Sequence, residues 1–187
     1  TAGGGDDGSF RAVIERTAVN PTLPSDLTKI GDYAFYQCSN LALTSLPAGV
    51  TSIGRYAFNQ CSNLALTSLP AGVTSIGGYA FNRCSNLALT SLPTALTTID
   101  SYAFDYCYAL DITSIPAGVT SIGSYAFEKC TLLKSITFLG TPSTIGNRAF
   151  YNCSGLRTIN APWAEGAVTG APWGATNVTI NYNYTGG

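Results

Sequence analysis

A phenylalanine recurs every 23 residues along most of this chain, and a cysteine follows each phenylalanine three positions later. A fixed period of roughly 20 to 50 residues is typical of solenoids, in which each repeat buries its apolar face by stacking on its neighbours. The spacing therefore predicts one stack of coils with a long repeated surface, and it argues against an enzyme built around a pocket. The residues concerned are Phe35, Phe58, Phe81, Phe104, Phe127 and Phe150, with Cys38, Cys61, Cys84, Cys107, Cys130 and Cys153.

Each coil contains two candidate strands. In residues 64–86, leucines at positions 64, 66 and 69 predict a short strand, and Pro70, which cannot donate to a ladder, ends it. Val73 and Ile76 predict a second extended segment, which Gly77 closes. Consecutive coils would then pair in parallel at about 4.8 Å, because the rest of each coil supplies the connection that parallel strands need.

Residues 79–84, Tyr-Ala-Phe-Asn-Arg-Cys, predict one helical or 3₁₀ turn per coil. On a helical wheel Ala80, Phe81 and Cys84 fall within about 100° of one another, so we expect them to share a buried face. Tyr79 falls about 140° from the centre of that face. We therefore expect the tyrosine to lie mostly outside.

The motif Ile-Gly-x-x-Ala-Phe-x-x-Cys-x-x-Leu, followed by a strand and Pro-x-x-Val-x-x-Ile-Gly, resembles the BspA-like leucine-rich repeats of bacterial surface proteins over about residues 22–163. One departure concerns the first four repeats. Their apolar residue lies five positions after the cysteine, whereas the family places it at six, as Ile136 and Ile159 do. A one-position shift flips side chains across a strand, so the register there, and whether Thr67 or Ser68 faces solvent, stays open.

The predicted fold class is an α/β repeat solenoid: a leucine-rich-repeat-like right-handed coil with 23-residue repeats, short parallel strands, one helical or 3₁₀ turn per coil, and a cap at both ends. We expect residues 1–21 to be a leader and N-terminal cap, with a capping strand at 10–14. Residues 22–163 would form six repeats. Residues 164–187 would form the C-terminal cap strand, since 177–184 alternate polar and apolar side chains.

The charge content limits the partners of this chain. Charged residues make up 10% of the sequence, against roughly 25% in an average soluble domain, and the net charge is −1. Such a chain lacks the basic footprint of a nucleic-acid-binding protein, and its short apolar runs predict no transmembrane segment. The sequence begins at Thr1 and has no methionine, so we expect an extracellular or cell-surface protein whose signal or anchor has been removed.

The sequence offers no set of catalytic or metal-binding residues. It contains no histidine, the commonest general base and metal ligand. The cysteines would form a line rather than converge on a metal, so we expect small apolar residues filling an inner corner, with disulfides between neighbours as the alternative. Asp100, Asp105 and Asp111 would lie on three different walls. We therefore expect no enzyme, no cofactor and no metal.

Two surface features are candidate binding sites for a partner. The first is a tyrosine stripe, whose rings could contact sugars or a protein, or instead only pack on one another. The second is the exposed strand ladder, with Ser114, Asp111, Lys134 and Arg157 at its more varied end; it could equally be a merely soluble face. The stripe consists of Tyr33, Tyr56, Tyr79, Tyr102 and Tyr125 and is interrupted by Arg148.

The sequence thus favours a secreted or cell-surface interaction module, expected to be a monomer. The family resemblance implies adhesion to host or bacterial surfaces, with a protein ligand such as fibronectin or fibrinogen, and a surface glycan is the other candidate partner. A passive spacer or accessory domain of a larger surface protein is the alternative, because residues 41–63 and 64–86 differ at only two positions. A carbohydrate-binding module that uses the tyrosine stripe is a further alternative.

Overall fold

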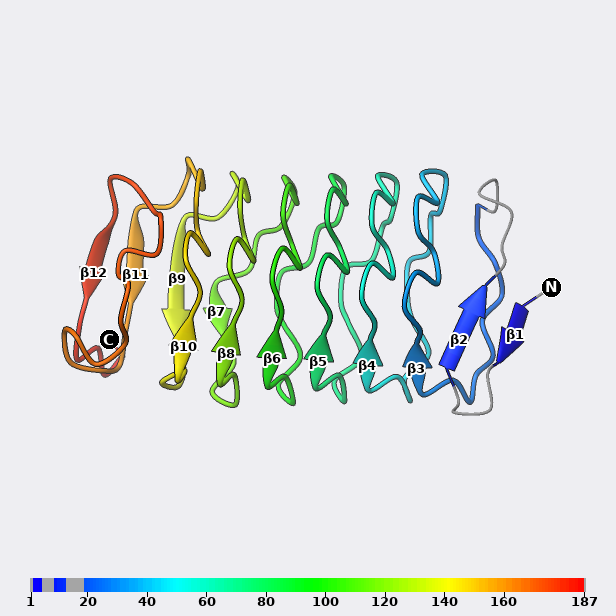
Figure 1. Ribbon diagram of the computed structural model, residues 1–187, viewed down its shortest axis with the longest axis horizontal. Helices are drawn as coiled ribbons and strands as arrows, with labels where there is room; N and C mark the ends of the chain where they lie inside the picture. Colours follow the sequence, from blue (N-terminus) through cyan, green and yellow to red (C-terminus); the bar gives the residue numbers. More distant parts are fainter. Residues whose placement is uncertain (1, 5–8, 13–18, 187) are drawn as a thin grey trace.

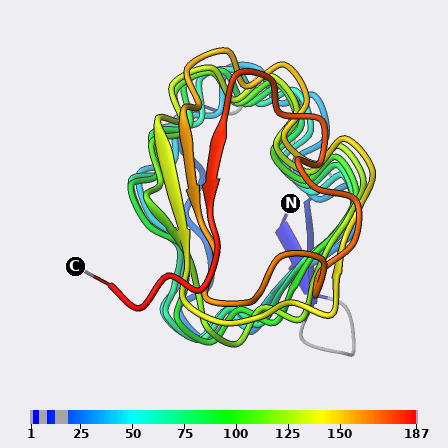
Figure 2. The ribbon, with the colours of Figure 1, turned by 90° about the vertical axis from the view of Figure 1, so that its left-hand side faces the viewer.

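The chain folds into a parallel β-solenoid of about seven turns, with one turn per 23-residue repeat (Figures 1 and 2). The computed structural model describes residues 2–4, 9–12 and 19–186. The described part of the chain contains twelve short strands and no helix. It therefore also contains no helix that is long and apolar enough to cross a membrane.

The larger sheet runs the length of the solenoid. Its strands come from the second candidate strand of each coil, as the sequence predicts, and equivalent residues pair in register, for example Ile53 with Ile76. At its N-terminal end β1 (Ala2–Gly4) pairs antiparallel with β2 (Ser9–Ala12). The remaining strands, in order, are β3 (Lys29–Ile30), β4 (Ser52–Ile53), β5 (Ser75–Ile76), β6 (Thr98–Ile99), β8 (Ser121–Ile122) and β10 (Thr144–Ile145).

The opposite wall carries strands only in its C-terminal half. They are β7 (Ser114–Ile115), β9 (Ser135–Phe138), β11 (Thr158–Asn160) and β12 (Thr179–Asn181), all parallel. The strand expected at 64–69 is absent, although its three leucines are buried. Thr67 and Ser68 both face solvent, and two successive exposed residues break the alternation that a strand needs. In β9 the alternation is regular, with Ile136 and Phe138 buried.

The prediction of a helical or 3₁₀ turn in each coil is wrong. We call this region the turn edge, comprising residues 31–38, 54–61, 77–84, 100–107, 123–130 and 146–153. Tyr79 and Arg83 have φ of 58° and 59°, in the left-handed region. Every second N–H crosses to the next coil, as Phe81 N does to Ala103 O at 2.8 Å, while the alternate N–H groups bond three residues back. A helix cannot form, because half of its donors are used between coils.

The interior consists of stacked columns of identical side chains. The six repeat phenylalanines are 0% exposed, and their rings stack at centroid distances of 5.1 to 5.5 Å. Ala80, Phe81 and Cys84 are all buried, as the wheel predicts, although the segment is not helical. Trp163 and Trp173 close the C-terminal end of this core, and Trp173 O accepts a hydrogen bond from Phe150 N at 3.0 Å.

The two ends differ from the repeats. At the C-terminal end β12 pairs with β11, so a strand forms within the stretch where alternation predicts one. At the N-terminal end β2 pairs with β3 and includes residues 10–12 of the capping strand expected at 10–14. Residues 13 and 14 of that expectation lie outside the described residues.

Candidate functional site

The five tyrosines of the stripe form one continuous aromatic column along the turn edge. Neighbouring rings are 4.6 to 4.9 Å apart between centroids and lie within 14° of parallel. Each tyrosine adopts a φ between 56° and 59°, which aims its side chain differently from that of a helical residue. The sequence identified the residues of this column, but a helical wheel could not give their stacked geometry.

Stacking determines which parts of the tyrosines a ligand can reach. Each inner ring has a neighbour on both faces, so ring-face stacking on a sugar is blocked there. The ring edges remain available: Tyr33 is 53% exposed and the other four are half-buried. The hydroxyls of Tyr56, Tyr79 and Tyr102 bond to no other described residue. Burial and the neighbouring phenols raise the pKa of Tyr79 and Tyr102, so these hydroxyls keep their protons and can donate.

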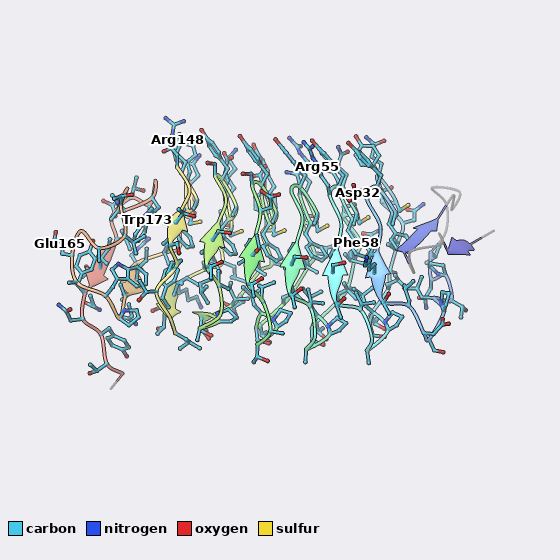
Figure 3. All side chains as sticks on the ribbon, turned by 60° about the horizontal axis from the view of Figure 1, so that its bottom comes forward. Asp32, Arg55, Phe58, Arg148, Glu165 and Trp173 are labelled. Carbon is cyan, nitrogen blue, oxygen red and sulfur yellow. The ribbon has the colours of Figure 1, made fainter. Side chains whose placement is uncertain are left out.

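An arginine closes the C-terminal end of the tyrosine column. Arg148 Nη1 donates to the Tyr125 hydroxyl at 3.1 Å, and its guanidinium lies 5.9 Å from the Tyr125 ring and 5.1 Å from the Tyr151 ring. The hydrogen bond to Tyr125 raises the pKa of Arg148. Figure 3 places Arg55 and Arg148 on the outer tips of the same edge, whereas Phe58 lies inside. The turn edge therefore combines phenol edges with fixed cations.

A second group on this edge was missed by the sequence reasoning. Arg83 Cζ lies 4.7 Å from the Tyr106 ring centroid and Lys129 Nζ lies 4.4 Å from it. Lys129 Nζ also donates to the Tyr106 hydroxyl at 3.0 Å, which raises the pKa of Lys129. We call these three residues the Tyr106 cluster. They are 23 residues apart, so the repeat phase was the signal that could have found them.

A polar ladder lies beneath the surface of the turn edge. Asn59 Nδ2 donates to Asn82 Oδ1 at 2.9 Å, and Asn82 Nδ2 donates to Asp105 Oδ2 at 2.7 Å. All three residues are buried, and Asp105 Oδ1 has no hydrogen-bond partner among the described residues. Burial and the nearby Glu128 raise the pKa of Asp105 to about 7. This carboxyl therefore carries little charge below neutral pH.

The strand face brings its predicted residues together, but it offers fewer fixed groups. Asp111, Lys134 and Arg157 occupy equivalent positions, and Arg157 N donates to Lys134 O at 2.9 Å. Arg157 Nη1 is occupied by two backbone carbonyls of its own coil, at 2.8 and 3.0 Å. Ser114 lies half-buried in β7. Asn160, at the equivalent position two coils after Ser114, is buried and donates through Nδ2 to Thr137 Oγ1 at 3.0 Å.

The cysteine column is part of the core. All six cysteines are free and buried, and the last five donate their thiols to a phenylalanine carbonyl of the preceding coil at 3.0 or 3.1 Å. Burial raises the pKa of Cys61, Cys84, Cys107, Cys130 and Cys153, which suppresses the reactive thiolate. Among the described residues no three cysteine or acidic side chains are grouped to hold a metal.

A stack of short parallel strands with a repeated outer edge defines the class of solenoid repeat proteins, which present long surfaces to partners. The model of the BspA type leucine-rich repeat region matches residues 10–133 and 97–165, with six copies. The chain belongs to this family of leucine-rich repeat proteins.

Solved structures are similar to this one, and the first of the following shares its fold. The leucine-rich repeat protein of T. pallidum, TpLRR, is 24% identical with a TM-score of 0.58, over 98% of this chain and 78% of that one. A leucine-rich repeat protein of Bacteroides ovatus is 22% identical, with a TM-score of 0.39, over 94% and 71% of the two chains. A leucine-rich cell surface protein of Faecalibacterium prausnitzii is 18% identical, with a TM-score of 0.35, over 98% and 92%. No curated protein sequence matches this chain.

Proposed function

We propose that this protein is a surface-exposed interaction module that binds a host or bacterial surface component through its turn edge. The observation that carries the proposal is the tyrosine column, whose rings are held parallel at 4.6 to 4.9 Å. Tyrosine is enriched among the residues that dominate binding energy, because it combines a large apolar body with a polar tip. A stacked tyrosine has already lost its rotamer freedom, so binding costs less entropy.

The physical character of the turn edge supports a protein or glycan partner. Its side chains are phenols, cations, amides and carboxylates on a rigid repeated frame, and repeat proteins bind through extended surfaces of this kind. The partner would contact ring edges and hydroxyls, since the inner ring faces are already covered. Membership of the BspA-type family favours an extracellular or cell-surface location and a role in adhesion.

A binding screen tests this proposal. The intact chain is assayed against fibronectin, fibrinogen and a glycan array, beside a Tyr79→Ala/Tyr102→Ala variant and a matched Thr67→Ala/Thr90→Ala variant on the opposite wall. We expect saturable binding that falls at least tenfold in the tyrosine variant and changes less than twofold in the threonine variant. Circular dichroism spectra and thermal midpoints establish that each variant is folded.

Two results would count against the turn edge. Binding that survives the tyrosine variant and falls when Lys134 and Arg157 are neutralised would move the site to the strand face. The absence of any binding at high micromolar concentration would favour a passive spacer. The near-identity of residues 41–63 and 64–86 supports that reading, because surfaces that select a partner usually differ between repeats.

A further inference from the structure

Three cations in the third, fifth and sixth segments of the turn edge are held in fixed positions by aromatic rings. Arg83 and Lys129 are within cation–π range of Tyr106. Lys129 is further fixed by its bond to the Tyr106 hydroxyl, and Arg148 by its bond to the Tyr125 hydroxyl. An aromatic neighbour orients a cation without neutralising it, so these side chains keep their full charge.

The same cations have carboxylates nearby, since Asp105 interacts electrostatically with Arg83 and Lys129, and Glu128 with Lys129 and Arg148. Within the described part of the chain, Arg83, Lys129 and Arg148 form no ion pair with a carboxylate. The acidic side chains closest in the repeat frame are Asp105, which is buried, and Glu128, which is half-buried. These two carboxylates are at least half-buried and Asp100 is exposed in the same part of the edge, whereas Arg83 and Arg148 are exposed, so the cations stand on the outer surface. Fixed cations that no close ion pair neutralises raise the local concentration of anions.

We propose that the turn edge between residues 77 and 153 binds an acidic oligosaccharide, a sugar chain that carries sulfate or carboxylate groups. The proposal rests on the function proposed above and specifies its ligand class. The Tyr106 cluster binds one anionic group, and Arg148 binds another further along the stack. The phenol hydroxyls of Tyr79 and Tyr102, which belong to the coils of Arg83 and Tyr106, hydrogen-bond sugar hydroxyls beside the cluster.

The backbone of the turn edge favours a sugar over an acidic peptide. An extended peptide gains much of its affinity by pairing its main chain with free N–H and C=O groups. Here the N–H groups are already used: Tyr106 N donates to Glu128 O at 2.8 Å, Phe104 N to the next coil, and Asp105 N, between them, to its own coil. The edge thus offers side chains alone, which suits a ligand whose polar groups are hydroxyls and anions.

The spacing of the cations also suits a repeating sugar chain. Arg83 and Lys129 belong to coils that are two steps apart, which is about 10 Å along the stack at the spacing of parallel strands. Arg148 belongs to the next coil after Lys129. The cations therefore stand at two places along the stack, the Tyr106 cluster and Arg148. A sugar chain that carries anions at intervals along its length can contact both.

Titration calorimetry on the full chain tests this inference with chondroitin 4-sulfate hexasaccharide as the probe. The neutral N-acetylglucosamine hexamer and a hexaglutamate peptide are the comparison probes. We expect the sulfated probe to bind and to weaken steeply with added salt. Arg83→Gln/Lys129→Gln should lower its affinity at least tenfold. The control Lys134→Gln/Arg157→Gln removes the same charge from the strand face and should change the affinity less than twofold.

The other outcomes separate this inference from the function on which it rests. An equal loss in both charge variants, or equally tight binding of hexaglutamate, would overturn it as a general response to charge. Binding of the neutral hexamer or of a matrix protein at the tyrosine column, without binding of the sulfated probe, would overturn it and leave the proposed function standing. If no probe, matrix protein or glycan bound, both this inference and the proposed function would fail.

Discussion

Replacing Asp105 by asparagine is expected to stabilise the solenoid at neutral pH. The wild-type carboxyl is buried at the end of the Asn59–Asn82 ladder, and its Oδ1 has no hydrogen-bond partner among the described residues. The introduced amide would accept from Asn82 through its oxygen, as the carboxylate does. The amide nitrogen would also present a donor toward Glu128 in place of a like charge. The substitution therefore continues the ladder and removes a desolvated charge.

The magnitude follows from the pKa of Asp105, which rises from 3.8 to about 7 on folding because of burial and Glu128. Each pKa unit corresponds to about 1.4 kcal/mol, so the shift of roughly three units amounts to about 4 kcal/mol in a fully desolvated site. Solvent screening at the turn edge reduces the expected value to about 2 kcal/mol. The pKa of Asp105 is raised in the folded state, so protonation of this carboxyl favours the folded protein. The stability that the protonated form provides is present in full below about pH 4 and is lost as the pH rises through about 7.

Urea unfolding at a series of pH values between about 5 and 8 measures this effect. The wild-type unfolding free energy should fall by about 1 to 3 kcal/mol more than that of Asp105→Asn across this range. Asp111→Asn is the matched control, because it removes the same charge from an exposed position. If the wild-type and Asp105→Asn curves ran parallel, Asp105 would be ionised in the folded protein and the reasoning would be refuted.

The remaining predictions concern the packing of the coils. Phe81→Ala should lower the unfolding free energy by roughly 3–5 kcal/mol in urea, because the ring is fully buried between two others. Tyr79→Ala should cost clearly less in the same assay, and an equal loss would show that the column is core rather than surface. Gly77→Ala should lower the thermal midpoint sharply, since its Cβ would lie 2.7 Å from a backbone nitrogen of the preceding coil; Gly72→Ala, with only a methyl at 3.9 Å, should not. The six thiols should react with a thiol reagent only on unfolding, because burial raises the pKa of most of them, and reaction in native buffer would contradict their burial.

The sequence was sufficient to predict the stacking of the coils and the residues of the interior. The 23-residue phase predicts the parallel pairing of Ser75–Ile76 with its neighbours, and the buried column that contains Phe81 and Cys84. It could not give the turn conformation. The left-handed φ of Tyr79 follows from hydrogen bonds to the next coil, such as Tyr79 N to Ser101 O at 3.0 Å, and a local pattern carries no information about such long-range bonds.

The candidate site was predicted in part. The tyrosine column could be identified from its phase, because identical residues at one phase must stack in a solenoid. The Tyr106 cluster was missed because its three residues differ in type, so no repeated letter marks their column. The place of Asp105 at the end of the Asn59–Asn82 ladder was missed for the same reason. Comparing residues at equal phase, rather than searching for repeated ones, would have placed Arg83 beside Tyr106 and Asn82 beside Asp105.

Nuclear magnetic resonance of the chain with labelled tyrosine rings and alanine methyls tests the central claim most directly, that the turn edge is the binding surface. A ligand from the screen is titrated, and chemical-shift changes are compared between the rings of Tyr79 and Tyr102 and the exposed methyls of Ala65 and Ala88, which lie on the wall opposite the larger sheet. The account predicts saturable shifts of the rings with the methyls unchanged. Shifts confined to the methyls would place the ligand on the opposite wall and contradict it.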